Sequence, residues 1–257
     1  RASGQILSLQ KNGKNLLVGG PTLMVLPLTG GGCYPNHNAN TPIYNDLCSQ
    51  WKANAVNAEK VRQDVVITVS GTYQEMDGEY KLTINANGTL WVDYHFKAKK
   101  DVNPRQWGMV FEAPASFDQT FWERKGLWSV YPDDHIGRTS GVAKLFYSDV
   151  PATVQPRQQP TWSWSHDANA LGSNDFRSTR RNIWYAGLKD HASHEILAVS
   201  DGSQHWRAWK NGDRIQFLVA DFVSPGDEMF LEGYYAKYRK PLKKGDEVKG
   251  KVTLNVK

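Results

Sequence analysis

Between Phe121 and Gly141 the sequence places aromatic side chains among planar polar ones. These residues are Trp122, Trp128, Tyr131, Asp133, Asp134, His135 and Arg138. The C–H face of a pyranose ring stacks on an aromatic plane, and its hydroxyl groups need directional hydrogen bonds. The segment therefore predicts a sugar-binding surface. The alternative is that Trp122 and Trp128 are core residues and that the charged residues form a tight turn.

A second loop-rich segment, from Val150 to Asp175, carries Trp162 and Trp164 behind several prolines. Proline cannot donate to a sheet ladder, so regular strand pairing is disfavoured here. In an extended backbone the i, i+2 spacing would put both rings on one face. We expect both rings to be at least partly exposed, as a ligand or partner surface that includes His166. Packing across the mouth of the fold is the alternative.

The elements that must position these segments are predicted to be strands. Alternation of polar and apolar residues recurs along the chain, and Asn12-Gly13 between two such runs is a strong hairpin signal. Further turns are expected at Asp77-Gly78, Asn87-Gly88, Asp201-Gly202 and Asn211-Gly212. Helical periodicity is weak, and only Ser49–Lys60 is expected to form a short helix. The final alternating run is expected to be an edge strand.

These patterns predict an all-β fold, a large antiparallel β-sandwich that forms one domain over residues 1–257. The 10 Trp, 11 Tyr and 22 Gly residues agree with β structure and aromatic binding surfaces. A long Gly-, Asn- and Pro-rich loop runs from Leu28 to Trp51, and loops of this length are usually functional or disordered. Asn45-Asp46 is a candidate polar anchor in it, or an ordinary Asx turn.

Charge and composition exclude several classes of protein. The net charge of +5 is dispersed, and the densest basic segment, Lys237 to Lys251, is interrupted by acidic residues, Gly and Pro. We interpret that segment as a solvated hairpin and expect no nucleic-acid binding. No apolar run is long enough for a membrane span. The chain begins at Arg1 without a visible signal peptide, and we expect a processed or excised product.

Cys33 and Cys48 could form a disulfide in an oxidising compartment, but two thiols do not decide the redox setting. No His or Cys lies near them at ligand spacing, which argues against zinc. Whether a divalent metal binds elsewhere stays open, and no cofactor is expected.

The segment Trp122–Arg138 resembles the signature of the β-galactosidase small-chain domain, the C-terminal β-sandwich of family 2 glycoside hydrolases. The matching residues are Trp122, Gly126, Tyr131, Pro132, Asp133 and Arg138, with residues 135–137 inserted before the arginine. A second match comprises Asn174, Arg177, Arg181 and Trp184. Of the family's Asp-Asn-Asp loop only Asn45 and Asp46 remain.

The resemblance implies a galactose-mutarotase-like supersandwich that lines the active site of a catalytic barrel elsewhere in the parent chain. It implies that Asp133 and Arg138 are structural, with a buried Arg138 that braces Asp133, and that Asn45 and Asp46 are structural too. The candidates for carbohydrate contact are Trp128, Tyr131, Asp134, His135, Trp162, Trp164, His166, Asp175, Arg177 and Arg181. The expected function is a non-catalytic carbohydrate-binding domain, in an extracellular or periplasmic location.

Two alternatives stay open. The chain could be an enzyme, either a hydrolase module active only with its barrel or a lyase or epimerase. The candidate carboxylate pairs are Glu123 with Asp134 and Asp133 with Asp175, and the candidates for an epimerase are His135, His166 and Glu123. It could also be a structural spacer. Arginines near the expected site favour acidic glycans, because guanidinium groups pair with carboxylates; they are Arg124, Arg138, Arg177, Arg180 and Arg181.

Overall fold

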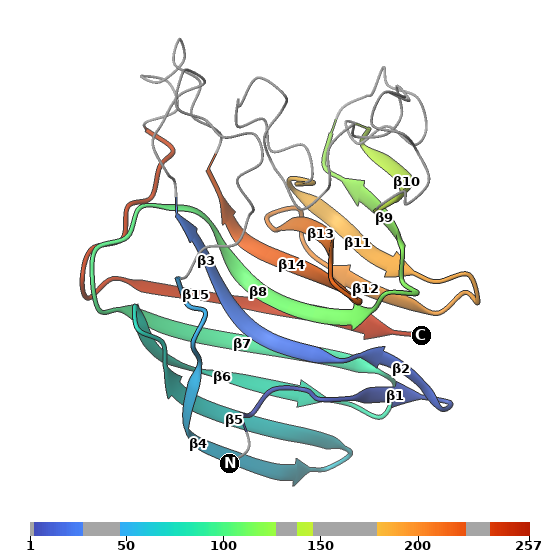
Figure 1. The fold of residues 1–257 in the computed structure, drawn as a ribbon, viewed down its shortest axis with the longest axis horizontal. Helices are drawn as coiled ribbons and strands as arrows, with labels where there is room; N and C mark the ends of the chain where they lie inside the picture. Colours follow the sequence, from blue (N-terminus) through green and yellow to red (C-terminus); the bar gives the residue numbers. More distant parts are fainter. Residues whose placement is uncertain (1–2, 28–46, 127–137, 146–178, 225–236) are drawn as a thin grey trace.

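Antiparallel β-strands make up the fold (Figure 1). The computed structural model describes residues 3–27, 47–126, 138–145, 179–224 and 237–257. No helix occurs in these ranges. The expected all-β class is therefore confirmed.

The larger sheet has nine strands in the order β10-β9-β11-β12-β15-β7-β6-β5-β4. Four consecutive strands at one end form a meander: β4 (Lys52–Val61), β5 (Asp64–Thr72), β6 (Met76–Ile84) and β7 (Thr89–Ala98). The alternating runs predict the last three of these as strands. The other strands are β9 (Gln119–Arg124), β10 (Ser140–Lys144), β11 (Ile183–Lys189), β12 (Glu195–Val199) and β15 (Glu247–Val256).

The smaller sheet has four strands in the order β13-β14-β8-β3. Its strands are β3 (Gly19–Pro27), β8 (Pro104–Pro114), β13 (His205–Asn211) and β14 (Arg214–Val223). A separate two-stranded ribbon precedes it, formed by β1 (Leu9–Lys11) and β2 (Lys14–Leu17). The ribbon turns at Asn12-Gly13, and φ values of 51° and 78° there confirm the hairpin that this dipeptide predicts.

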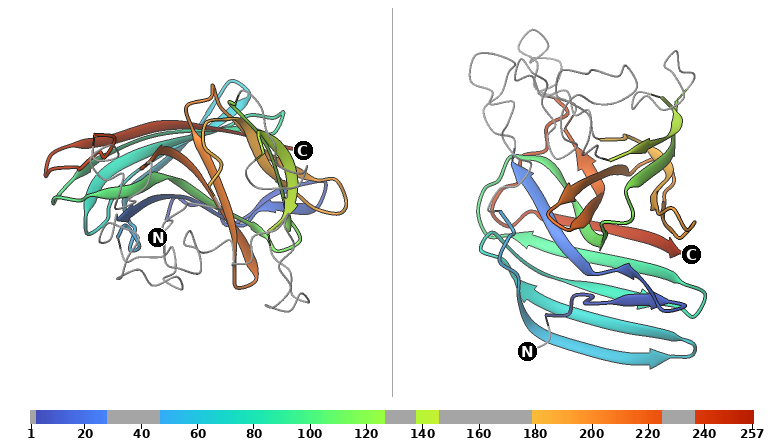
Figure 2. Two further views of the ribbon diagram at one scale, coloured as in Figure 1. Left: turned by 90° about the horizontal axis from the view of Figure 1, so that it is seen from above. Right: turned by 45° about the vertical axis from the view of Figure 1, so that its right-hand side comes forward.

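The two main sheets form the layers of a sandwich, which is clearest from above (Figure 2). One hydrophobic core joins them, and it includes Trp122 of the larger sheet and Trp206 of the smaller one. Polar contacts also cross between the layers. The Tyr73 hydroxyl accepts a hydrogen bond from the Leu23 N–H at 3.0 Å, and Trp206 Nε1 donates to Thr120 Oγ1 at 3.0 Å.

Several local expectations are wrong. Residues 52–61, expected to be helical, form β4 instead, because this segment pairs with β5 along its length at one edge of the larger sheet. The final strand β15 is not an edge strand, since it pairs with β12 and β7. Alternation reports that a strand has one buried face, but it does not report how many neighbours the strand has. The basic segment Lys237 to Lys251 runs into β15 and is therefore not a separate hairpin.

Two of the expected turns are misplaced. Asp77-Gly78 lies inside β6, and the turn comes earlier, after β5 ends at Thr72. Gly78 is needed for close packing there, because an added Cβ would lie 2.2 Å from the His95 carbonyl oxygen. The last hairpin turns at residues 212–213, one position later than expected. The turns at Asn87-Gly88 and Asp201-Gly202 are confirmed, with positive φ at both glycines.

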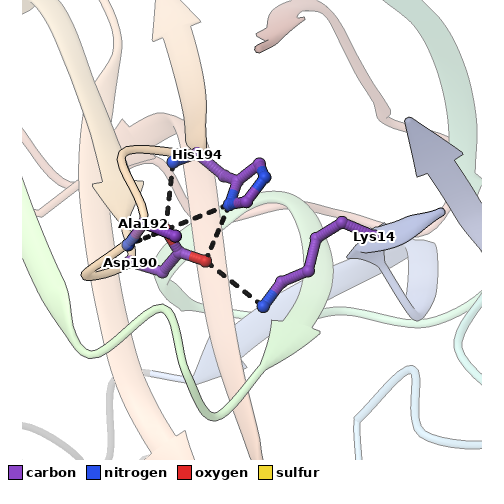
Figure 3. Close-up of polar contacts among 4 residues, drawn as sticks. All are labelled: Lys14, Asp190, Ala192 and His194. Carbon is purple, nitrogen blue, oxygen red and sulfur yellow. Dashed lines mark hydrogen bonds and ion pairs between the residues drawn. The ribbon is translucent and has the colours of Figure 1, made fainter. Parts of the chain in front are cut away.

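A buried carboxylate ties the two-stranded ribbon to the larger sheet (Figure 3). Asp190, in the turn between β11 and β12, accepts hydrogen bonds from the N–H groups of Ala192 and His194 at 2.9 and 3.0 Å. Its other contacts are His194 Nδ1 at 3.0 Å and Lys14 Nζ at 3.3 Å. Burial alone would raise the pKa of Asp190, but the hydrogen bonds from His194, Lys14 and Ala192 outweigh it and lower the pKa.

Far-ultraviolet circular dichroism should show a β-type spectrum with little helix, because the described chain is built from strands. A helical content of about a third, the average of soluble proteins, would contradict the sandwich.

Candidate functional site

A cavity of about 560 Å³ opens to solvent at one end of the smaller sheet. His205 begins β13 and Phe222 and Val223 end β14, and antiparallel pairing brings these ends together. Segments before β11 and before β15 complete the wall. The described lining residues are Arg181, Asn182, Ser203, His205, Asp221, Phe222, Val223, Tyr238 and Lys240.

His205 is held as a neutral imidazole. Its Nδ1 accepts a hydrogen bond from the Asn182 backbone N–H at 3.1 Å, so the ring proton must reside on Nε2. Burial, together with the positive charges of Arg181 and Lys240, lowers the pKa of His205 to about 4. The ring is therefore an uncharged hydrogen-bond donor at neutral pH.

Asp221 lies between this cavity and the larger sheet. A register shift between Ala220 and Phe222 marks a bulge at this position in the pairing of β14 with β8. Its Oδ1 accepts a hydrogen bond from Gln204 Nε2 at 2.8 Å, and its Oδ2 accepts one from the Tyr94 hydroxyl. Burial raises the pKa of Asp221, while the hydrogen bonds from Tyr94 and Gln204 oppose the rise.

Cations and aromatic rings also contribute to the cavity wall. Arg181 Nη2 donates to the carbonyl of Ser224, which fixes the guanidinium at the rim. Lys240 Nζ lies 5.2 Å from the ring centroid of Phe222, and Phe222 is stacked on Trp107 with centroids 4.4 Å apart. Tyr238 is 45% exposed. An exposed ring beside directional donors is an arrangement that suits a sugar.

A second cavity of about 450 Å³ adjoins the first and shares Ser203 and Asp221 with it. Its wall comes from the end of β12, the following turn, and β15, through Val199, Asp201 and Lys251. Gln204 Nε2 donates to the Lys251 carbonyl at 2.9 Å as well as to Asp221. These two hydrogen bonds hold in place the Gln204 side chain that separates the two cavities.

Most of the residues singled out from the sequence lie outside the described ranges. These are Trp128, Tyr131, Asp134, His135, Trp162, Trp164, His166, Asp175, Arg177, Asp133, Asn45 and Asp46. Their roles stay predictions. Arg181 is described, and it lines the cavity.

The described part of the opening segment is structural. Trp122 is 1% exposed, and its Nε1 donates to the Arg138 carbonyl at 3.0 Å. Arg180, also buried, lies with its guanidinium 4.3 Å from the Trp122 ring centroid. The alternative that Trp122 is a core residue is therefore correct. Glu123 lies on β9, is exposed, and is not among the described residues that line the cavity.

Within the described ranges Cys48 is a free, buried thiol, and Cys33 lies outside them. The described residues contain no group of three His, Cys, Asp or Glu side chains suited to a metal ion. Nor does any helix among them have the length and apolarity needed to cross a membrane.

Sequence reasoning missed most of the cavity. His205 and Asp221 belong to alternating strands with no local motif, and only the three-dimensional pairing of β13 and β14 brings them together. Tyr238 and Lys240 lie in the basic segment whose composition predicts a solvated hairpin. The sequence signal that points to the cavity is an aromatic residue, Tyr238, within this basic segment.

The described strands form a two-layered antiparallel β-sandwich. The family model described as β-galactosidase small chain matches residues 1–160. The chain therefore belongs to the β-galactosidase small chain family.

Solved structures to which the chain is similar include a putative aldose 1-epimerase from Escherichia coli K12, at 10% identity and a TM-score of 0.47, covering 99% of this chain and 93% of that one. A galactose 1-epimerase from Lactobacillus acidophilus NCFM has 10% identity and a TM-score of 0.45, with 98% of this chain and 82% of that one covered.

A glycoside hydrolase family 97 enzyme from Pseudoalteromonas sp. strain K8, in complex with acarbose, has 9% identity and a TM-score of 0.39. The match covers 97% of this chain but 32% of that one. None of the curated proteins compared matches the chain. Identities this low say nothing of the activity of this chain.

The neutral state of His205 has a measurable consequence. The unfolded chain takes up a proton on this residue near its ordinary pKa of about 6.5, whereas the folded chain does so only near pH 4. We expect this residue to make the protein less stable as the pH falls from about 6.5 to about 4. In His205→Gln that part of the pH dependence should be missing. Urea unfolding of both proteins across this pH range measures the change in the free energy of unfolding. An equal pH dependence of this free energy in the two proteins would show that the imidazole is not held neutral.

Proposed function

We propose that this chain is a non-catalytic carbohydrate-binding domain of a glycoside hydrolase, with the cavity between β13, β14 and Tyr238 as a sugar site. Membership of the β-galactosidase small chain family supports the association with a glycoside hydrolase. The observation that carries the binding role is the exposed Tyr238 ring on a cavity that also contains Arg181, His205 and Asp221.

Each of these groups suits one part of a sugar. The Tyr238 ring offers a flat apolar face for the C–H side of a pyranose. Arg181 and the Nε2–H of His205 are donors for ring hydroxyl groups, and both are fixed by backbone hydrogen bonds. Such fixed groups lose little conformational freedom when a ligand binds.

A binding role is favoured over catalysis because of the way Asp221 is held. Glycosidases use two carboxylates across a cleft, one as acid and one as base or nucleophile. Asp221 is the one carboxylate among the described lining residues of this cavity, and both of its oxygens already accept hydrogen bonds within the protein. We therefore place the chemistry on a catalytic barrel elsewhere in the parent chain, in an extracellular or periplasmic setting.

Affinity electrophoresis of the chain through gels that contain different polysaccharides tests this role. We expect at least one neutral or acidic polysaccharide to retard the chain, with no release of reducing sugar from the same polymer. Release of reducing ends or change of anomer by the purified chain would instead make it an enzyme. Free migration in every gel would leave the structural spacer as the better description.

A further inference from the structure

The cavity that Tyr238 borders has an unequal balance of charge. Among its described lining residues, Arg181 and Lys240 are cations and Asp221 is the one carboxylate. A cavity lined in this way favours an anionic ligand, provided that Asp221 does not neutralise the two cations.

Hydrogen bonds within the protein hold the carboxylate of Asp221. Its two oxygens accept hydrogen bonds from Gln204 and from Tyr94, which lies on β7 of the larger sheet. An added Cβ on Gly250 of β15 would lie 2.1 Å from Asp221 Oδ2, so the carboxylate packs directly against that sheet. The negative charge is therefore held at the base of the cavity, on the side of the larger sheet.

Lys240 supplies a positive charge to the cavity wall. Its ammonium lies 5.2 Å from the Phe222 ring and 5.9 Å from the Trp107 ring, and both contacts are with aromatic faces. None of the ion pairs among the described residues joins Lys240 to a carboxylate. The stacked pair of rings holds the side chain over the cavity without neutralising its charge.

Two further groups add a donor and a positive charge. His205 has its Nδ1 occupied by the Asn182 N–H, which leaves Nε2–H as a donor. Lys237 Nζ lies over the Tyr238 ring, 4.9 Å from its centroid, so a further cation is placed at one face of this ring. Donors and cations around an aromatic platform suit a sugar ring that carries a negative group.

We propose that this cavity binds an acidic sugar, a uronate, with its ring against Tyr238 and its carboxylate between Lys240 and Arg181. The inference rests on the proposed carbohydrate-binding function and names the class of its ligand. A uronate places a carboxylate at the edge of a pyranose ring, so one residue can use the aromatic face and the cations together. Neutral sugars would use the same platform and leave Lys240 without a partner.

Matched polymers test the proposal. Polygalacturonate, alginate and glucuronoxylan are compared with their carboxyl-reduced forms, in which each carboxylate becomes a hydroxymethyl group, and with poly-glutamate as an anion without sugar. We expect the chain to bind at least one acidic polymer roughly tenfold or more tightly than its reduced form. Added salt should weaken this preference. Lys240→Met should remove most of the preference, while Lys249→Met, at an exposed position on β15 outside the cavity, should keep it.

Four results would overturn the proposal. Equal binding of the acidic and reduced forms would show a carbohydrate site without acid recognition, and the proposed function would stand. Equal binding of poly-glutamate would show attraction by charge alone. Binding of neutral polysaccharides but of no acidic polysaccharide would place the ligand in another class. If the chain bound neither neutral nor acidic polysaccharides, the proposed function would be wrong as well.

Discussion

Replacing Trp206 by alanine is expected to lower the free energy of unfolding by about 3–5 kcal/mol, the range measured for large aromatic side chains in cores. The side chain is fully buried between the layers and is stacked on Phe217 with ring centroids 5.1 Å apart. Its Nε1 donates to Thr120 Oγ1 on the opposite sheet, so the substitution leaves a cavity and also removes a buried hydrogen bond. Both losses lower the free energy of unfolding.

Urea unfolding followed by tryptophan fluorescence and circular dichroism measures this effect. Trp184→Ala is the matched control, since the Trp184 side chain is 41% exposed on β11, and we expect it to cost less than about 1 kcal/mol. Equal destabilisation by the two substitutions would contradict the position of Trp206 in the core.

The second large effect is expected at Asp190, where alanine should lower the free energy of unfolding by about 3 kcal/mol. The buried carboxylate accepts hydrogen bonds from Ala192 and His194 and pairs with Lys14. Its removal leaves two backbone N–H groups and one imidazole without their acceptor. Lys14→Met should cost no more than about 1 kcal/mol, because the Lys14 side chain is 37% exposed and exposed ion pairs contribute little.

The pH dependence of this effect follows from the lowered pKa of Asp190. The stabilisation is fully present above the ordinary aspartate pKa of about 4, and it is lost as the pH falls through the lower pKa of the folded state. The difference in stability between the wild-type protein and Asp190→Ala should therefore be largest near neutral pH and should shrink in acid. A difference that stays constant down to about pH 2 would show that the charge of Asp190 is not what stabilises the turn.

The strands could be predicted from the sequence because alternation is a local property. The runs that form β5, β6 and β7 are amphipathic with period two, and Asn12-Gly13 sets the first hairpin by its own backbone preference. The segment of β4 was misjudged because its Ala, Asn and Lys residues are mostly exposed at a sheet edge, so burial gives no period-two signal there.

The order of the strands could not be predicted in the same way. Strand β15 is inserted between β12 and β7, which lie far from it in sequence, and no local pattern specifies those neighbours. The cavity depends on the same long-range pairing. His205 and Asp221 lie on the two paired strands at the open end of the β13–β14 hairpin, while Arg181 and Tyr238 come from segments outside the strands.

The family resemblance was recognisable from short motifs, and the match over residues 1–160 confirms it. The motif around Trp122 indicated the family correctly, yet Trp122 itself packs in the core. Aromatic residues that mark a family can thus serve the fold, and an exposed aromatic residue outside the motif, Tyr238, borders the cavity.

The most direct test of the carbohydrate-binding account compares the affinity of Tyr238→Ala and Trp184→Ala with that of the wild-type chain for a polysaccharide that retards it. Both variants remove an exposed aromatic ring, but only Tyr238 borders the cavity. We predict that Tyr238→Ala lowers the affinity about tenfold, as expected for the loss of one stacking platform, and that Trp184→Ala leaves it unchanged. Unchanged binding by Tyr238→Ala, with its melting temperature preserved, would contradict the assignment of this cavity as the sugar site.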